Sequence, residues 1–65
     1  MNFFTYEVIA YNNQNEAINK KEFNTQLESK VYFQICTEEN DFHCVQQIKV
    51  TNHEKREVIR EHHSN

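Results

Sequence analysis

The sequence contains no glycine, no proline and no tryptophan among its 65 residues. Glycine-rich loops that bind nucleotide phosphates cannot form without glycine, so the P-loop and the dinucleotide-binding fingerprint are both excluded. The residues with positive φ in tight turns must then be Asn, Asp or His, because these types tolerate the left-handed region best after glycine. Asn-rich segments at residues 12–15 and near Asn52 therefore predict the chain reversals.

Clusters of positive charge and long apolar runs are also lacking. The formal net charge is −3, and the seven Lys and Arg residues are scattered along the chain. Proteins that bind a nucleic-acid backbone usually concentrate positive charge on one face, which makes nucleic acid an unfavoured partner here. No stretch approaches the ~20 apolar residues of a membrane span, and no apolar segment follows a basic start. We expect a cytoplasmic protein without a membrane partner, in which Cys36 and Cys44 are free thiols.

The composition indicates a folded chain, with 37% hydrophobic and 12% aromatic residues. We expect one small domain over residues 1–65, ordered from about residue 2 to residue 61, with a frayed tail at 62–65. This length is close to the lower limit for a self-sufficient core, so self-association or a partner matters more than usual.

Four segments have the composition and alternation of strands. They are residues 3–11, about 16–23, 42–51 and 57–61, each bounded by polar residues. In the first segment the even positions Phe4, Tyr6, Val8 and Ala10 make the better core face. In the third segment Phe42, Cys44, Ile48 and Val50 share one face.

The segment from Thr25 to Asn40 predicts a helix. Thr25 and Glu28 have the capping-box spacing, and Asn40 can close the helix in place of glycine. Leu27, Val31 and Ile35 then form one apolar stripe, which we expect to pack on the sheet. Residues 30–37 are also good strand formers, and a strand here would make a five-stranded meander resembling a small barrel. We favour the helix because small barrels need glycine at their corners.

The predicted fold is a two-layer α+β ββαββ arrangement. A four-stranded antiparallel sheet is covered on one face by the single helix, whose stripe packs against Phe4, Tyr6, Val8, Ile48 and Val50.

No cluster of residues predicts chemistry. Cys36 and Cys44 lack the short spacing of structural zinc pairs, and His43 and Cys44 point to opposite faces of a strand. His62 and His63 belong to the expected tail. We therefore expect no catalytic residue, no bound metal and no cofactor.

The favoured function is that of a non-enzymatic protein-interaction module, with a homodimer as one form. Its docking surface is expected on the open sheet face or an edge strand, with one outward residue on the helix. The candidate partner-binding residues are Phe3, Ile9, Tyr11 and Phe33. The alternative is a nucleic-acid-binding module, in which Tyr6 or Tyr11 stacks on bases and cations contact phosphates. These cations are Lys20, Lys21, Lys49, Arg56 and Arg60.

In size, element order and acidity the chain resembles small phage proteins that bind and inhibit host proteins. The resemblance implies an inhibitor or adaptor of a host protein, and the abundance of Asn, Lys and Ile is typical of AT-rich genomes. No residue motif carries this resemblance, so no functional residue is transferred from it.

Overall fold

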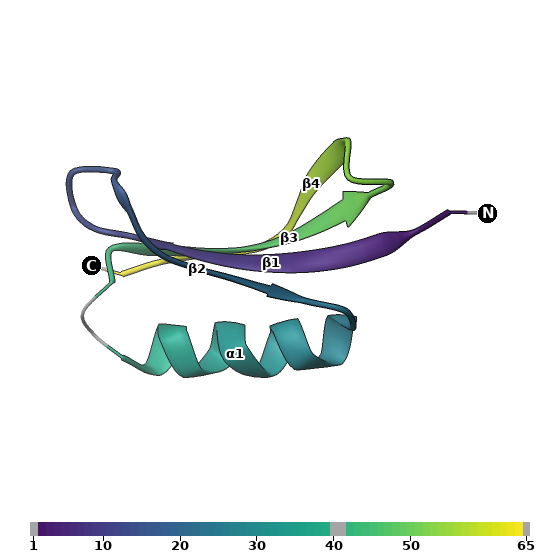
Figure 1. The fold of residues 1–65 in the computed structure, drawn as a ribbon. Helices are drawn as coiled ribbons and strands as arrows, with labels where there is room; N and C mark the ends of the chain where they lie inside the picture. Colours follow the sequence, from purple (N-terminus) through teal and green to yellow (C-terminus); the bar gives the residue numbers. More distant parts are fainter. Residues whose placement is uncertain (1, 40–41, 65) are drawn as a thin grey trace.

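The computed structural model describes residues 2–39 and 42–64, and these form one sheet and one helix (Figure 1). The elements are β1 (Phe4–Tyr11), β2 (Ala17–Phe23), α1 (Gln26–Glu38), β3 (Cys44–Thr51) and β4 (Lys55–His63). The antiparallel sheet has the strand order β2-β1-β3-β4, and α1 lies along one face. The predicted two-layer ββαββ fold is confirmed. The five-stranded alternative is wrong, because residues 30–37 are helical.

Helix α1 begins at the predicted cap. The Thr25 hydroxyl accepts from the backbone N–H of Glu28 at 3.2 Å and donates to the Glu28 carboxylate at 2.8 Å. The helix ends at Glu38, where the backbone N–H of Glu39 donates to the Ile35 carbonyl at 3.2 Å. Asn40, the predicted end, lies outside the described residues. Within the described part of the chain, no helix combines the length and apolar character that crossing a membrane requires.

The turns use the residue types that the lack of glycine predicts. Positive φ occurs at Asn15 (63°), Asn52 (54°) and His53 (61°). In the β3–β4 turn the backbone N–H of Glu54 donates to the Thr51 carbonyl at 3.0 Å across the two positive-φ residues. This is the φ pattern of a type I′ turn, which matches the twist of a hairpin.

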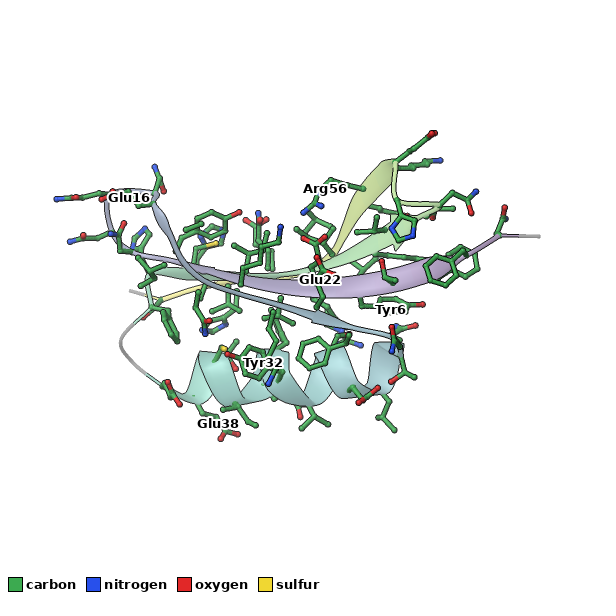
Figure 2. The ribbon with its side chains drawn as sticks, in the orientation of Figure 1. Tyr6, Glu16, Glu22, Tyr32, Glu38 and Arg56 are labelled. Atoms are coloured by element: carbon green, nitrogen blue, oxygen red, sulfur yellow. The ribbon has the colours of Figure 1, made fainter. Side chains whose placement is uncertain are left out.

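The first apolar cluster, here called the inner core, lies between α1 and the sheet. Its buried members are Val8, Ala10, Phe33, Cys36 and Val45, with Phe23, Tyr32 and Phe42 packed against it. Figure 2 shows Tyr32 on the side of α1 that meets the sheet. Val8 and Ala10 face the helix as predicted.

The orientation of α1 about its axis differs from the prediction. Leu27, Val31 and Ile35 are exposed, whereas Phe33, expected to point outward, is buried in the inner core. The reason lies in two fully buried polar side chains. Gln47 on β3 donates from Nε2 to Oγ of Ser29 on α1 at 2.6 Å, and neither residue has exposed surface. The buried Nε2 group needs an acceptor, and Ser29, turned toward the sheet, supplies it, whereas Gln47 Oε1 has no hydrogen-bond partner among the described residues.

The second apolar cluster, here called the outer core, lies on the sheet face that α1 leaves open. It consists of Ile9, Ile48 and Val50, with Tyr11 packed against them. The prediction that Ile48 and Val50 lie beneath the helix is wrong. The register pairs Val8 with Gln47, so the odd positions of β3 share the helix-facing side with the even positions of β1.

Strand β4 is longer than predicted. It covers Lys55–His63 instead of residues 57–61, so His62 and His63 belong to a strand and not to a frayed tail. A register shift opposite Gln47 and Ile48 inserts one extra residue in β4 and changes which of its side chains face the helix.

We predict that Ser29→Ala lowers the free energy of unfolding by about 1–3 kcal/mol, because it leaves the Gln47 amide buried without its acceptor. Urea denaturation followed by circular dichroism measures the change.

Thr37→Ala is the matched control. The Ser29 hydroxyl also donates to the Gln26 carbonyl at 2.8 Å, and the Thr37 hydroxyl donates to the Gln34 carbonyl in the same way at 2.9 Å. Thr37 has no partner on the sheet among the residues that the structure describes. Its loss is expected to cost less than about 0.5 kcal/mol. The double variant Ser29→Ala with Gln47→Leu removes both polar partners. It should recover most of the unfolding free energy that Ser29→Ala loses. Equal effects of Ser29→Ala and Thr37→Ala would contradict the role given to the buried pair.

Candidate functional site

The outer face of α1 is a row of three large aliphatic side chains. Leu27, Val31 and Ile35 are 71%, 49% and 47% exposed, and their spacing of four residues places them on one side of the helix. They are exposed because Ser29, Phe33 and Cys36 occupy the opposite side, against the sheet. We call Leu27, Val31 and Ile35 the helix face.

A shallow apolar groove of about 410 Å³ follows the helix face beside the end of β2. It is lined by Phe23, Leu27, Glu28, Val31, Tyr32 and Ile35. The rings of Phe23 and Tyr32 pack at 5.4 Å between centroids. Asn19 on β2 donates to the Tyr32 hydroxyl at 2.6 Å, which fixes that side of the groove.

The charges beside the helix face are mixed in the first turns and acidic at the end. Glu28 and Lys30 flank its start, and the helix ends at Glu38 with Glu39 as its cap. The last turn has no basic residue, although the C-terminal end of a helix carries partial negative charge. These two carboxylates therefore lack the compensation that a cation in the last turn usually provides.

The four partner-binding residues predicted from the sequence do not form one surface. Phe3 is 52% exposed and packs against the ring of His53, with 5.0 Å between centroids. Ile9 is buried in the outer core and Phe33 in the inner core, so the expectation that they point to solvent is wrong. Tyr11 is half-buried, and its hydroxyl donates to Gln46 at 3.1 Å.

The cations named for the nucleic-acid alternative divide between the two faces of the sheet. Lys20 and Arg56 pair with Glu7 on the open face. Lys21 lies over the Tyr32 ring at 5.2 Å, and Lys49 lies over the Phe4 ring at 4.3 Å, both on the helix side. Arg60 is the register partner of the helix-facing Gln47. The five cations are therefore divided between opposite faces and do not make the continuous positive surface that a phosphate backbone requires.

Glu7 is a buried carboxylate on the open face, 5% exposed. Arg56 reaches from β4 across β3 and donates from Nη1 and Nη2 to its two oxygens at 2.9 Å and 2.6 Å. Lys20 on β2 lies 3.6 Å away. Figure 2 shows Arg56 on the side of the sheet opposite the helix. The Arg56 hydrogen bonds outweigh burial and hold the pKa of Glu7 below its ordinary value of 4.5.

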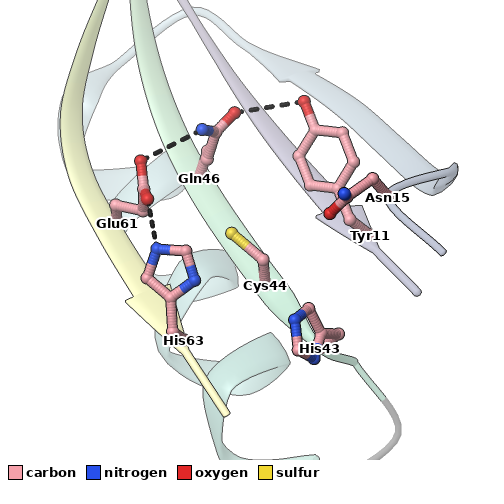
Figure 3. A pocket seen from close by; sticks show the side chains of 7 residues that line it. All are labelled: Tyr11, Asn15, His43, Cys44, Gln46, Glu61 and His63. Atoms are coloured by element: carbon pink, nitrogen blue, oxygen red, sulfur yellow. Dashed lines mark hydrogen bonds and ion pairs between the residues drawn. The ribbon is translucent and has the colours of Figure 1, made fainter. Parts of the chain in front are cut away.

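A polar pocket of about 240 Å³ lies at the start of β3 (Figure 3). Its lining residues are Tyr11, Asn15, His43, Cys44, Gln46, Glu61 and His63. The sequence prediction missed it because His63 was assigned to a frayed tail. Burial raises the pKa of the Cys36 and Cys44 thiols, and the charge of Glu61 adds to this at Cys44. Neither thiol has the lowered pKa of an activated nucleophile.

Comparison with known proteins identifies no relative: no family model matches the chain, and the curated proteins and solved structures give no match.

We predict that Arg56→Met lowers the free energy of unfolding at pH 7 by about 1–2 kcal/mol, a value reduced for the partial exposure of Arg56. Because the pKa of Glu7 is lowered in the folded state, its stabilisation is present above pH 4.5 and is lost as the pH falls through the folded-state pKa. The difference between the variant and the original chain should therefore shrink at low pH. Urea denaturation at a series of pH values measures this.

Arg60→Met on the same strand is the control, since Arg60 forms no ion pair with any residue in the described ranges. It should change the unfolding free energy by less than about 0.5 kcal/mol at every pH. A difference for Arg56→Met that stays constant down to acidic pH would contradict the assignment to Glu7.

Proposed function

We propose that this chain is a protein-interaction module that pairs with a second copy of itself through the helix face. The observation that supports the proposal is the row formed by Leu27, Val31 and Ile35, which are large, aliphatic and about half exposed or more. Single exposed apolar residues are ordinary, but a contiguous row beside an apolar groove is typical of a protein contact. The site proposed from the sequence thus moves from the sheet to the helix.

The helix face is complementary to itself. Leu27 and Ile35 lie four residues on either side of Val31, so a twofold axis at Val31 pairs two copies with their helices antiparallel. Leu27 of one copy then packs against Ile35 of the other, and Val31 packs against its equivalent. The contact between Leu27 and Ile35 occurs twice and the contact between the two Val31 side chains occurs once, on the axis, so one short row of three side chains provides a closed interface.

The charges at the helix ends favour the same arrangement. Glu38 and Glu39 lie at the negative end of their own helix without a basic residue in the last turn. In the antiparallel pair this end lies beside the N-terminal end of the other helix, which has partial positive charge and carries a single carboxylate, Glu28. A parallel pair brings the acidic ends of both copies together, which is unfavourable.

The size of the surface sets the expected affinity. One 13-residue helix buries less than a standard interface of about 800 Å² per partner. We therefore expect a reversible dimer with a Kd of roughly micromolar order. The inhibitor or adaptor role and the cytoplasmic location stay predictions.

We predict that Val31→Glu converts the dimer to a monomer at high micromolar concentration, because it places two carboxylates together at the twofold axis. Sedimentation velocity measures the change. Phe3→Asp is the matched control, since Phe3 is exposed but distant from the helix face, and it should leave the dimer intact. A wild-type chain that stays monomeric, or a dimer lost only in Phe3→Asp, overturns the proposal.

The relative direction of the two helices can be tested with paired charges. In an antiparallel pair, Leu27→Glu with Ile35→Lys places opposite charges against each other across the interface. Leu27→Glu with Ile35→Glu places like charges against each other. The first double variant should dimerise measurably more strongly than the second. A parallel pair would show strong repulsion in both, because each position would then face its own equivalent.

A further inference from the structure

Three different donor groups converge at the polar pocket. Cys44 is the first residue of β3 and the register partner of His63, the last residue of β4. Glu61 lies two residues before His63, so strand alternation places its side chain on the same face. A ligand atom from each of the three side chains lies within 4.8 Å of the other two. Figure 3 shows the Cys44 sulfur directed toward the space beside Glu61 and His63.

The donor set has the chemistry of a zinc site. Thiolate sulfur, imidazole nitrogen and carboxylate oxygen are all zinc ligands, with bond lengths of about 2.0–2.3 Å. In a tetrahedral site such ligands lie about 3.3–3.6 Å from one another. The Cys44 sulfur therefore needs to approach the other two donors by up to roughly 1 Å, whereas Glu61 and His63, which already touch, need to move apart to admit the ion. Side-chain rotations provide both movements. Three protein ligands leave a fourth position toward the pocket, where His43 and Asn15 line the opening.

A chain of hydrogen bonds holds the carboxylate in place. The Tyr11 hydroxyl donates to Gln46 Oε1 at 3.1 Å, and Gln46 Nε2 donates to Glu61 Oε2 at 3.1 Å. This leaves Glu61 Oε1 free to contact His63 Nε2. Figure 3 shows this chain crossing from β1 through β3 to β4. Such outer contacts orient metal ligands and are a regular feature of zinc sites.

The surroundings of Cys44 separate this cluster from an ordinary surface ion pair. The side chains of Glu61 and His63 are 39% and 62% exposed, and a contact between them alone would be unremarkable. Cys44, however, is buried and holds its sulfur against them from the neighbouring strand. Only one of the two cysteines has such neighbours, because Cys36 lies in the inner core.

We propose that Cys44, Glu61 and His63 bind one Zn²⁺ ion per chain, with the fourth position open to water. Binding releases the thiol proton of Cys44 to solvent and uses the neutral imidazole of His63 and the carboxylate of Glu61. The ion links the first residue of β3 to the last residue of β4. It thereby holds the open end of this hairpin, opposite the β3–β4 turn.

Titration with Co²⁺ and then Zn²⁺ tests the proposal, with the reduced chain. Co²⁺ should bind one ion per chain and produce a thiolate-to-cobalt charge-transfer band in the near ultraviolet, and Zn²⁺ should remove this band. Cys44→Ser should abolish the band, and His63→Gln should weaken binding by at least about tenfold. His63 is exposed, so its replacement tests binding even if Cys44→Ser fails to fold.

Two controls differ from the ligands only in position. Cys36→Ser removes the other thiol, and His62→Gln removes the adjacent imidazole, which lies on the opposite side of β4. Both should retain the band and the affinity. The site does not depend on pairing of the helix faces, so Val31→Glu should retain them as well. Absence of the cobalt band, unchanged affinity in His63→Gln, or equal losses in His63→Gln and His62→Gln overturns the proposal.

Discussion

The hydrogen bond between Gln47 and Ser29 is the constraint on which the arrangement of the two layers depends. The Gln47 amide lies in the middle of an apolar layer and needs a polar partner, and Ser29 is the residue of α1 whose hydroxyl lies within hydrogen-bond distance of it. Meeting that requirement turns one side of the helix inward together with Phe33 and Cys36. The same rotation leaves Leu27, Val31 and Ile35 exposed to solvent. One buried polar contact thus determines both the inner core and the surface available to another molecule.

The sheet has apolar side chains on both faces, although only one face is covered by a helix. On the open face, Tyr11 packs against Ile9, Ile48 and Val50, and Arg56, the register partner of Val50, crosses to Glu7. A chain of this size gains buried area by using both sides of its sheet. The bidentate ion pair therefore has a packing role in addition to its electrostatic one, because the aliphatic part of arginine covers apolar neighbours.

Local patterns in the sequence predict the elements, whereas contacts between elements decide the rest. Alternation, the Thr25 cap and the Asn-rich turns indicate the order of strands and helix. The rotation of α1 could not be predicted from its apolar stripe, because the stripe with the largest side chains is not the one that meets Gln47. Which side chains of β3 face the helix depends on the register between β3 and β1. Alternation within a single strand does not reveal that register. The helix face could not be predicted without the rotation of α1. The polar pocket could not be predicted without the length of β4, which makes His63 the register partner of Cys44.

The strands run along the long axis of a molecule measuring 40 × 21 × 15 Å. The start of β1 and the end of β4 lie at opposite ends of that axis (Figure 1). A pulling force applied between these two points acts parallel to the strands and shears the ladders that join β1 to β3 and β3 to β4. In this shear geometry the hydrogen bonds of a ladder carry the force together and break together. When a strand is pulled away sideways, they break one after another. The domain is accordingly built to resist stretching along its length better than peeling of either edge strand.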